Sequence, residues 1–133
     1  MDFLTLYANL VRALRLSQAF AHVGAITQPA DTLSTALSGG LPAVLVALPD
    51  LSWLPPMPGA ANYTGLARVE LTLKADPART DAGTLRLLVQ QLRAMALQAD
   101  PAGSALLLQD RLLPGPLFDY RITVRYKVLE PLP

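Results

Sequence analysis

The sequence predicts an α+β fold, with a mixed or antiparallel sheet of about four strands and two amphipathic helices packed on one face. Two segments place apolar residues at three- and four-residue spacing, and two others alternate strictly between apolar and polar residues. Apolar residues make up 52% of the chain and charged residues only 16%, enough to bury a core. At this length, we expect residues 1–133 to form a single domain.

A first helix is predicted over residues 3–21, with polar side chains on the face opposite its apolar stripe. The stripe consists of Phe3, Leu6, Tyr7, Leu10 and Leu14. Asp2 is placed to cap the first turn, and Gly24 marks the end of the helix. His22 then lies near the C-terminal end, where the helix dipole favours a cation. We interpret His22 as a helix-end or interface residue, and the alternative is a catalytic histidine acting alone.

The segment after this helix is irregular, with a short helix predicted from Asp31 or Thr32 to Leu37. Residues 43–48 are then predicted to form a strand. They are apolar on both faces, which is typical of a strand that is central in a sheet or covered on both sides.

A proline-rich loop is predicted over residues 49–62, and it contains the only tryptophan of the chain. Loops of this length in small domains are usually functional or mobile. Tryptophan and methionine are enriched in the cores of protein interfaces. The candidate interface residues of this loop are Leu51, Trp53, Leu54 and Met57. The alternative is that the loop folds back and covers an edge of the sheet.

Two strands with clean alternation are predicted over residues 63–74 and 118–128. Because each strand is polar on one face, we expect both helices on the apolar face and the other face wet or free for a partner. A second helix is predicted over residues 81–99, between two Ala-Asp-Pro-Ala segments that we interpret as turns. A short strand is predicted at 106–108 and a short C-terminal tail at 129–133.

If the two alternating strands share a sheet, their polar face carries five basic residues against two acidic ones, a surplus of three positive charges. The basic residues are Arg68, Lys74, Arg121, Arg125 and Lys127, and the acidic residues are Glu70 and Asp119. No aromatic residues interleave with these charges, although proteins that bind single-stranded nucleic acid use aromatics to stack bases. We therefore interpret this face as solvated or as a surface for a protein partner, with nucleic-acid binding as the alternative.

The sequence contains no pattern typical of a catalytic, metal or cofactor site. It has no cysteine, which excludes disulfides, thiolate metal sites and a thiol nucleophile, and a single histidine, which excludes a multi-histidine metal site. No phosphate-binding loop, dinucleotide-binding motif or hydrolase motif occurs. We expect no catalytic residues, no metal and no cofactor, and hence a protein that is not an enzyme.

The net charge and the hydropathy of the chain indicate which partners and which compartment to expect. A formal net charge of +1 gives no general attraction to nucleic acid or to an anionic membrane. The first residues lack the positive charge of a secretion signal, and the longest apolar run is far too short to span a membrane. We therefore expect a soluble protein of the cytoplasm that associates with other subunits.

The order of these elements resembles that of a known family. It comprises a leading amphipathic helix, Leu-Pro-Ala-Val-Leu-Val at 41–46, a long irregular loop, an alternating strand at 67–73, an arginine-containing helix and a final alternating strand at 120–126. Together these are similar to the tail-terminator, or tail-completion, proteins of long-tailed bacteriophages and related contractile particles. Related neck and head–tail joining proteins share the same outline. The resemblance covers most of the chain.

The resemblance implies a structural subunit that forms a six-fold (hexameric) ring on the finished tail tube, stops its growth and presents a surface to the head. Its partners would be copies of itself, the tail tube protein and the head–tail connector protein, with DNA passing through the lumen without sequence-specific binding and with no membrane partner. It would be assembled in the host cytoplasm and located in the tail or neck of the virion. The alternative is a small non-viral cytoplasmic binding or regulatory module that dimerises through its sheet face.

Overall fold

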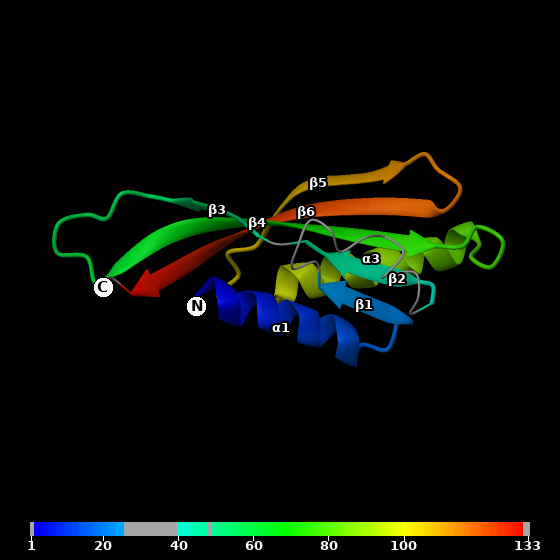
Figure 1. Ribbon diagram of the computed structural model, residues 1–133, viewed down its shortest axis with the longest axis horizontal. Helices are drawn as coiled ribbons and strands as arrows, with labels where there is room; N and C mark the ends of the chain where they lie inside the picture. Colours follow the sequence, from blue (N-terminus) through cyan, green and yellow to red (C-terminus); the bar gives the residue numbers. More distant parts are fainter. Residues whose placement is uncertain (1, 26–39, 48, 132–133) are drawn as a thin grey trace.

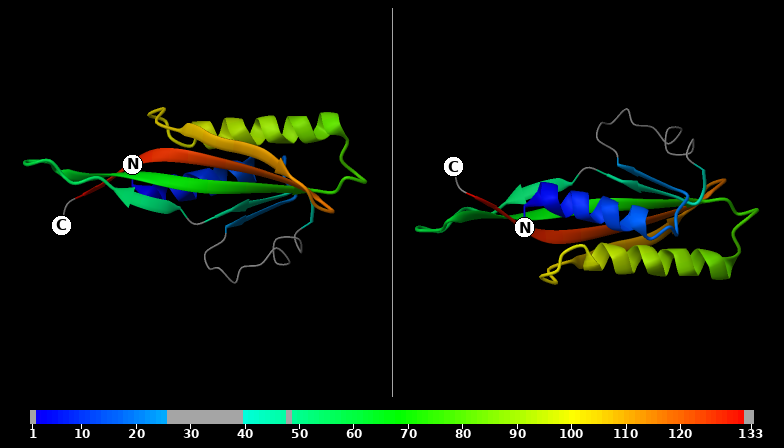
Figure 2. Two further views of the ribbon diagram at one scale, coloured as in Figure 1. Left: turned by 90° about the horizontal axis from the view of Figure 1, so that it is seen from above. Right: turned by 90° about the horizontal axis from the view of Figure 1, so that it is seen from below.

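The computed structural model describes residues 2–25, 40–47 and 49–131 of the chain. Their elements are, in order, α1 (Phe3–Leu16), β1 (His22–Ala25), β2 (Ala43–Val46), β3 (Asp50–Trp53), β4 (Asn62–Ala75), α3 (Ala82–Gln98), β5 (Leu106–Leu113) and β6 (Phe118–Pro131). The strands form one mixed sheet, and both helices lie on the same face of it (Figure 1, Figure 2). The predicted α+β class is confirmed, although the sheet has six strands and not about four.

Two long strands form the spine of the sheet. β4 and β6 are antiparallel and pair along their whole lengths, from Asn62 opposite Pro131 to Ala75 opposite Phe118. The strand order is β1-β2-β4-β6-β5, and β3 also pairs with β4, beyond the end of β2. Only β1 and β2 are parallel among the described strands. β3 and β5 therefore lie on opposite edges of the sheet (Figure 2, left).

α1 begins where it was predicted to begin, but it ends earlier. The Asp2 side chain accepts a hydrogen bond of 2.7 Å from a backbone N–H of the first turn, so the predicted N-cap is confirmed. The helix ends at Leu16, and Gln18 then has a φ of 57°, a left-handed conformation through which an α-helix cannot continue. His22 and Gly24 belong to β1. The predicted placement of His22 at a helix end, with Gly24 as the stop, is therefore wrong.

α3 lies within its predicted range, between two similar turns. In the turn before it, Asp76 Oδ1 accepts a hydrogen bond of 2.9 Å from the Ala78 N–H. In the turn after it, Asp100 Oδ1 accepts one of 3.0 Å from the Ala102 N–H. The interpretation of both Ala-Asp-Pro-Ala segments as turns is therefore confirmed, because each aspartate satisfies local backbone while the following proline stops regular structure.

The hydrophobic core fills the space between the helices and the sheet. The spine contributes the apolar face that its alternation predicted, and the helices contribute their apolar stripes. Fully buried spine residues include Ala67, Leu71, Leu73, Ile122, Val124 and Tyr126. The Tyr126 hydroxyl donates a hydrogen bond to the Ala96 carbonyl, which ties α3 to the sheet, and burial raises the pKa of this hydroxyl. Each large apolar side chain buried here contributes about 1.5–3 kcal/mol.

At one end the spine extends past the helices as a narrower ribbon that we call the hairpin arm (residues 50–66 with 127–131; Figure 1), although Val128 at its base is still fully buried in the core. β3 is its outer strand, so the predicted loop at 49–62 is wrong in part. β4 is much longer than β2 and leaves backbone groups of its first half free on that side, and β3 pairs with these groups.

Two further boundaries differ from the predictions. β6 runs on to Pro131 because it pairs with the first residues of β4. Residues 129–131 of the predicted tail are therefore strand, and residues 132–133 lie outside the described residues. β5 extends from Leu106 to Leu113, past the predicted 106–108. The short helix predicted near 31–37 and the last residue of the predicted strand 43–48 lie outside the described residues.

Candidate interaction surfaces

The exposed apolar side chains of the hairpin arm lie toward its tip. Trp53 is 44% exposed, Leu54 49% and Met57 78%. Leu51, the fourth candidate in this segment, is half-buried and packs against the core. Three of the four predicted interface residues are therefore available for contact, and a strand rather than a loop presents Trp53.

Trp53 is held in place by its neighbours. It lies directly opposite Gly65, where an added Cβ would come within 2.6 Å of the indole ring. Tyr63 meets the indole edge-on, with ring centroids 6.4 Å apart. A surface hollow of about 320 Å³ is lined by Trp53, Tyr63 and Glu130, and Glu130 accepts a hydrogen bond of 3.2 Å from the Phe3 N–H. The segment therefore covers the edge of β4 and still exposes aromatic surface.

We call the sheet face opposite the helices (Figure 2) the bare face. The register of β4 and β6 places the predicted basic residues on it. They are Arg68, Lys74, Arg121, Arg125 and Lys127. Arg68 lies directly opposite Arg125, and like charges in this arrangement repel each other. Asp50 lies opposite Arg68 on the other side, but neither residue forms an ion pair within the described part of the chain.

One cluster on the bare face neutralises part of its own charge. Asp119 accepts hydrogen bonds from Lys74 Nζ at 2.6 Å and from Arg121 Nε at 3.2 Å. Burial alone would raise the pKa of Asp119, but the hydrogen bonds and positive charges of Lys74 and Arg121 outweigh it and lower that pKa. Lys74 and Arg121 therefore stabilise the sheet. The predicted cations that keep no acidic partner among the described residues are Arg68, Arg125 and Lys127.

A second set of exposed apolar side chains, which was not predicted from the sequence, lies along the edge strand β5, on both faces of the sheet. Leu106 is 47% exposed, Leu108 39% and Leu112 50%. Asp110 of this strand pairs with Arg93 of α3 on the helix side of the sheet. The signal was present as leucines spaced among polar residues, but the prediction ended the strand after its first three leucines.

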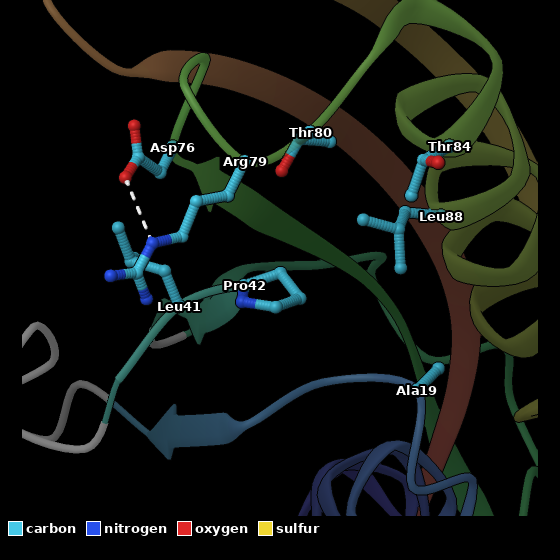
Figure 3. A pocket seen from close by; sticks show the side chains of 8 residues that line it. All are labelled: Ala19, Leu41, Pro42, Asp76, Arg79, Thr80, Thr84 and Leu88. Carbon is cyan, nitrogen blue, oxygen red and sulfur yellow. Dashed lines mark ion pairs between the residues drawn. The ribbon is translucent and has the colours of Figure 1, made fainter.

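A cleft of about 620 Å³ lies between the end of α1, the start of β2 and the start of α3 (Figure 3). It is lined by Ala19, Leu41, Pro42, Asp76, Arg79, Thr80, Thr84 and Leu88. Among the described residues that line it, the carboxylate of Asp76 and the guanidinium of Arg79 are paired with each other at 4.0 Å. The Asp81 carboxylate already occupies the adjacent N-terminus of α3, where it accepts a hydrogen bond of 2.7 Å from the Thr84 N–H. The cleft therefore offers hydroxyl groups and apolar surface for binding.

Within the described residues, no group of three or more histidine, aspartate and glutamate side chains is arranged to hold a metal ion. Neither of the two described helices has the length and hydropathy needed to cross a bilayer. Comparison of the sequence with protein-family models and with curated proteins gives no match.

Proposed function

We propose that this chain is a structural tail-terminator or neck subunit of a long-tailed bacteriophage or related contractile particle. Copies of the chain join into a hexameric ring that caps the tail tube and helps to join the tail to the head. The proposal rests on the resemblance in element order and on one observation of the structure. Exposed apolar side chains lie on two opposite edges of the same sheet, and the two sets differ in their residues.

A ring requires two different contact surfaces on each copy. In a closed ring each copy meets its two neighbours through two different surfaces, whereas a two-fold dimer uses one surface twice. The hairpin arm exposes Trp53, Leu54 and Met57 on the β3 side. β5 exposes Leu106, Leu108 and Leu112 on the other side. A dimer formed through either set would leave the other set in water, so the distribution favours the ring over the dimeric regulatory module.

The bare face supports a role among further partners. Arg68, Arg125 and Lys127 give it positive charge that is not neutralised within the described residues. In the assembled particle this face is available to the tail tube protein, to the head–tail connector protein, or to DNA that passes without sequence-specific contacts. Such contacts depend on charge and shape, so they weaken as salt is added.

The test is native mass spectrometry combined with negative-stain imaging of the purified chain, alone and with assembled tail tubes. Six-fold rings, or caps at one end of the tubes, are the expected result. A stable dimer that does not bind tubes would contradict the proposal and favour the regulatory module.

A matched pair of variants tests the hairpin arm. Trp53→Ala removes an exposed aromatic side chain of the arm, and Leu87→Ala removes an exposed apolar side chain of α3 away from it, which is 61% exposed. Trp53→Ala is expected to reduce ring formation and Leu87→Ala to leave it unchanged. Unchanged assembly in Trp53→Ala would remove the arm from the proposal.

A further inference from the structure

The two exposed edges of the sheet have properties that fit each other. β5 has a free outer edge in the described part of the chain, and its regular stretch, Gln109–Leu113, follows the irregularity in its pairing between Leu107 and Gln109. Proteins usually protect such edges with charges or prolines. Here the charge of Asp110 is already paired with Arg93, so Arg111 is the one unpaired charge of the stretch. This edge is open to pairing with another strand.

Strand direction restricts which strand can pair there. β3 and β6 both run antiparallel to β4, and β5 runs antiparallel to β6. β3 and β5 therefore point in opposite directions. Neighbouring copies in a ring are related by rotation, and a rotation about an axis along the strands would keep the strand directions. In such a ring, β3 of one copy would meet β5 of the next as an antiparallel pair.

The side-chain faces of the two strands also agree. β3 places Leu51 on the helix side of the sheet, opposite Ala67, and β5 places Leu112 on the same side, opposite Tyr120. An antiparallel pair with Leu51 opposite Leu112 brings these apolar side chains together. The same alignment covers Asp50 to Leu54 and Gln109 to Leu113, segments of equal length. Leu54 already extends the β3–β4 pairing, since its N–H donates to the Thr64 carbonyl at 2.9 Å.

Charge complementarity favours a second copy as the occupant. Arg111 of β5 is exposed and lies opposite Arg121, whose guanidinium already pairs with Asp119. Asp50 of β3 is exposed, and neither Asp50 nor Arg111 forms an ion pair within the described residues. In the alignment above, Ser52 lies opposite Arg111 and Asp50 lies diagonal to it on the bare face. Diagonal neighbours are within reach of long side chains, so the acid of one copy meets the unpaired cation of the next.

The position of β3 along the sheet also suits a closed ring. Asp50 is level with Arg68 and Arg125, whereas Leu113 is level with Asp119, nearer the other end of β6. β3 and the regular stretch of β5 are therefore displaced from each other along the strands. A sheet that closes on itself requires tilted strands and such an offset between neighbours.

We propose that the ring is built by strand addition, in which Asp50–Leu54 of one copy pairs with Gln109–Leu113 of the next and each junction is closed by the Asp50–Arg111 ion pair. The bare faces of successive copies then form one continuous surface. This inference rests on the proposed ring function and specifies the contact by which the ring forms.

The chain has no cysteine, so introduced cysteines report this contact without background. One preparation carries Ser52→Cys and another carries Gln109→Cys, both at exposed positions of the bare face. The two are mixed and treated with a short bismaleimide cross-linker. A covalent dimer is expected in the mixture and in neither preparation alone, because a head-to-tail contact brings position 52 of one copy to position 109 of another. A control mixture uses Arg79→Cys in place of Ser52→Cys; that side chain is 89% exposed and lies in the turn after β4, beyond the end of the strand that is far from β3.

Any cross-linking result other than a dimer found only in the mixture overturns the contact. No dimer above the control mixture excludes strand addition at these edges, and a dimer in either preparation alone indicates a two-fold pairing instead. Caps on tail tubes without this cross-link would leave the proposed function standing and remove the contact. Cross-linked rings that do not cap tubes would leave the contact standing and remove the tail-terminator role.

A charge-swap series tests the ion pair. Asp50→Lys and Arg111→Glu are each expected to weaken self-association about two- to five-fold, as loss of an exposed ion pair does. The double variant Asp50→Lys/Arg111→Glu is expected to recover most of the loss, because the charges are exchanged. Equal weakening in the double variant and the single variants would exclude the pair.

Discussion

The spine of the sheet passes through two environments, and its two halves behave differently. In the inner half, Leu71 and Ile122 lie under the helices and are fully buried. In the hairpin arm, Tyr63 lies on the same face of β4 but is only half-buried, and Leu129 on the bare face is 40% exposed. The alternation weakens in the arm, where Leu129 lies on the bare face and Glu130 on the helix side. Burial along the spine therefore depends on the reach of α1 and α3 as well as on the alternation.

The largest difference between the two halves is expected in stability. Leu71→Ala removes a fully buried side chain and leaves a cavity, which is expected to cost about 2–5 kcal/mol of unfolding free energy. Leu129→Ala in the arm is expected to cost no more than about 0.5 kcal/mol. Urea denaturation of the two variants measures both. Equal losses would show that the arm is part of the same packed core.

The next effect belongs to the ion cluster of the inner half. Asp119→Asn leaves Lys74 and Arg121 without their shared carboxylate and is expected to cost about 1.5–3 kcal/mol at neutral pH. Because the pKa of Asp119 is lowered in the folded protein, its contribution is fully present above the unfolded value of about 3.9 and is lost as pH falls below it. The difference in unfolding free energy between wild type and Asp119→Asn should therefore become smaller at acidic pH. A difference in unfolding free energy that stays constant from neutral pH to pH ~2 would contradict a stabilising role for the Asp119 carboxylate.

A smaller effect is expected where the arm is most tightly packed. Gly65→Ala would place a Cβ within 2.6 Å of the Trp53 ring, so the ring must move, at a cost of about 1–2 kcal/mol. Trp53 is the only tryptophan, and its fluorescence should change in this variant. Gly83→Ala is the control, since its Cβ meets no atom closer than 3.5 Å and the exchange favours a helix. Fluorescence identical to wild type in Gly65→Ala would mean that the indole does not cover Gly65.

The smallest effect on stability is expected at the tip of the arm. Met57 is 78% exposed, so Met57→Ser is expected to change the unfolding free energy by less than about 0.5 kcal/mol. If the tip contributes to the ring contact, the same variant should raise the concentration needed for ring formation in analytical ultracentrifugation. If the unfolding free energy of Met57→Ser falls, with or without a change in the concentration needed for ring formation, Met57 contributes to the stability of the fold and not only to a contact.

The elements that were predicted well are those whose apolar residues recur at a regular spacing. Apolar spacing placed α1 and α3, and alternation placed β4 and β6 with the correct residues on each face. β3 escaped prediction because it is short and followed by prolines, and it exists through backbone pairing with β4, which leaves no pattern in side chains. β1 was missed because the apolar residues after Leu16 continue the spacing of the helix. The helix ends before Gln18, whose left-handed conformation cannot be recognised in the sequence.

The candidate surfaces divide in the same way, into residues that the sequence pattern identifies and residues whose role depends on strand pairing. The basic residues of the bare face were found because alternation fixes them, and Trp53 was found because tryptophan is conspicuous in a proline-rich segment. The exposed leucines of β5 were missed because the sequence does not state which strand is an edge; that depends on pairing between distant segments. The neutralisation of Lys74 by Asp119 likewise depends on the register of two strands far apart in the chain.

The pairing of Asn62 with Pro131 also orders events during folding. β4 is synthesised well before β6, its principal partner, and contacts between such distant segments form slowly because a long loop must close first. β3 and β4 together make only a two-stranded hairpin, which is marginal by itself in water. The hairpin arm therefore acquires its final shape only after the last residues of β6 have emerged from the ribosome and found their place. Contacts that depend on this arm are delayed until the chain is folded, so incomplete chains would be kept out of the proposed ring.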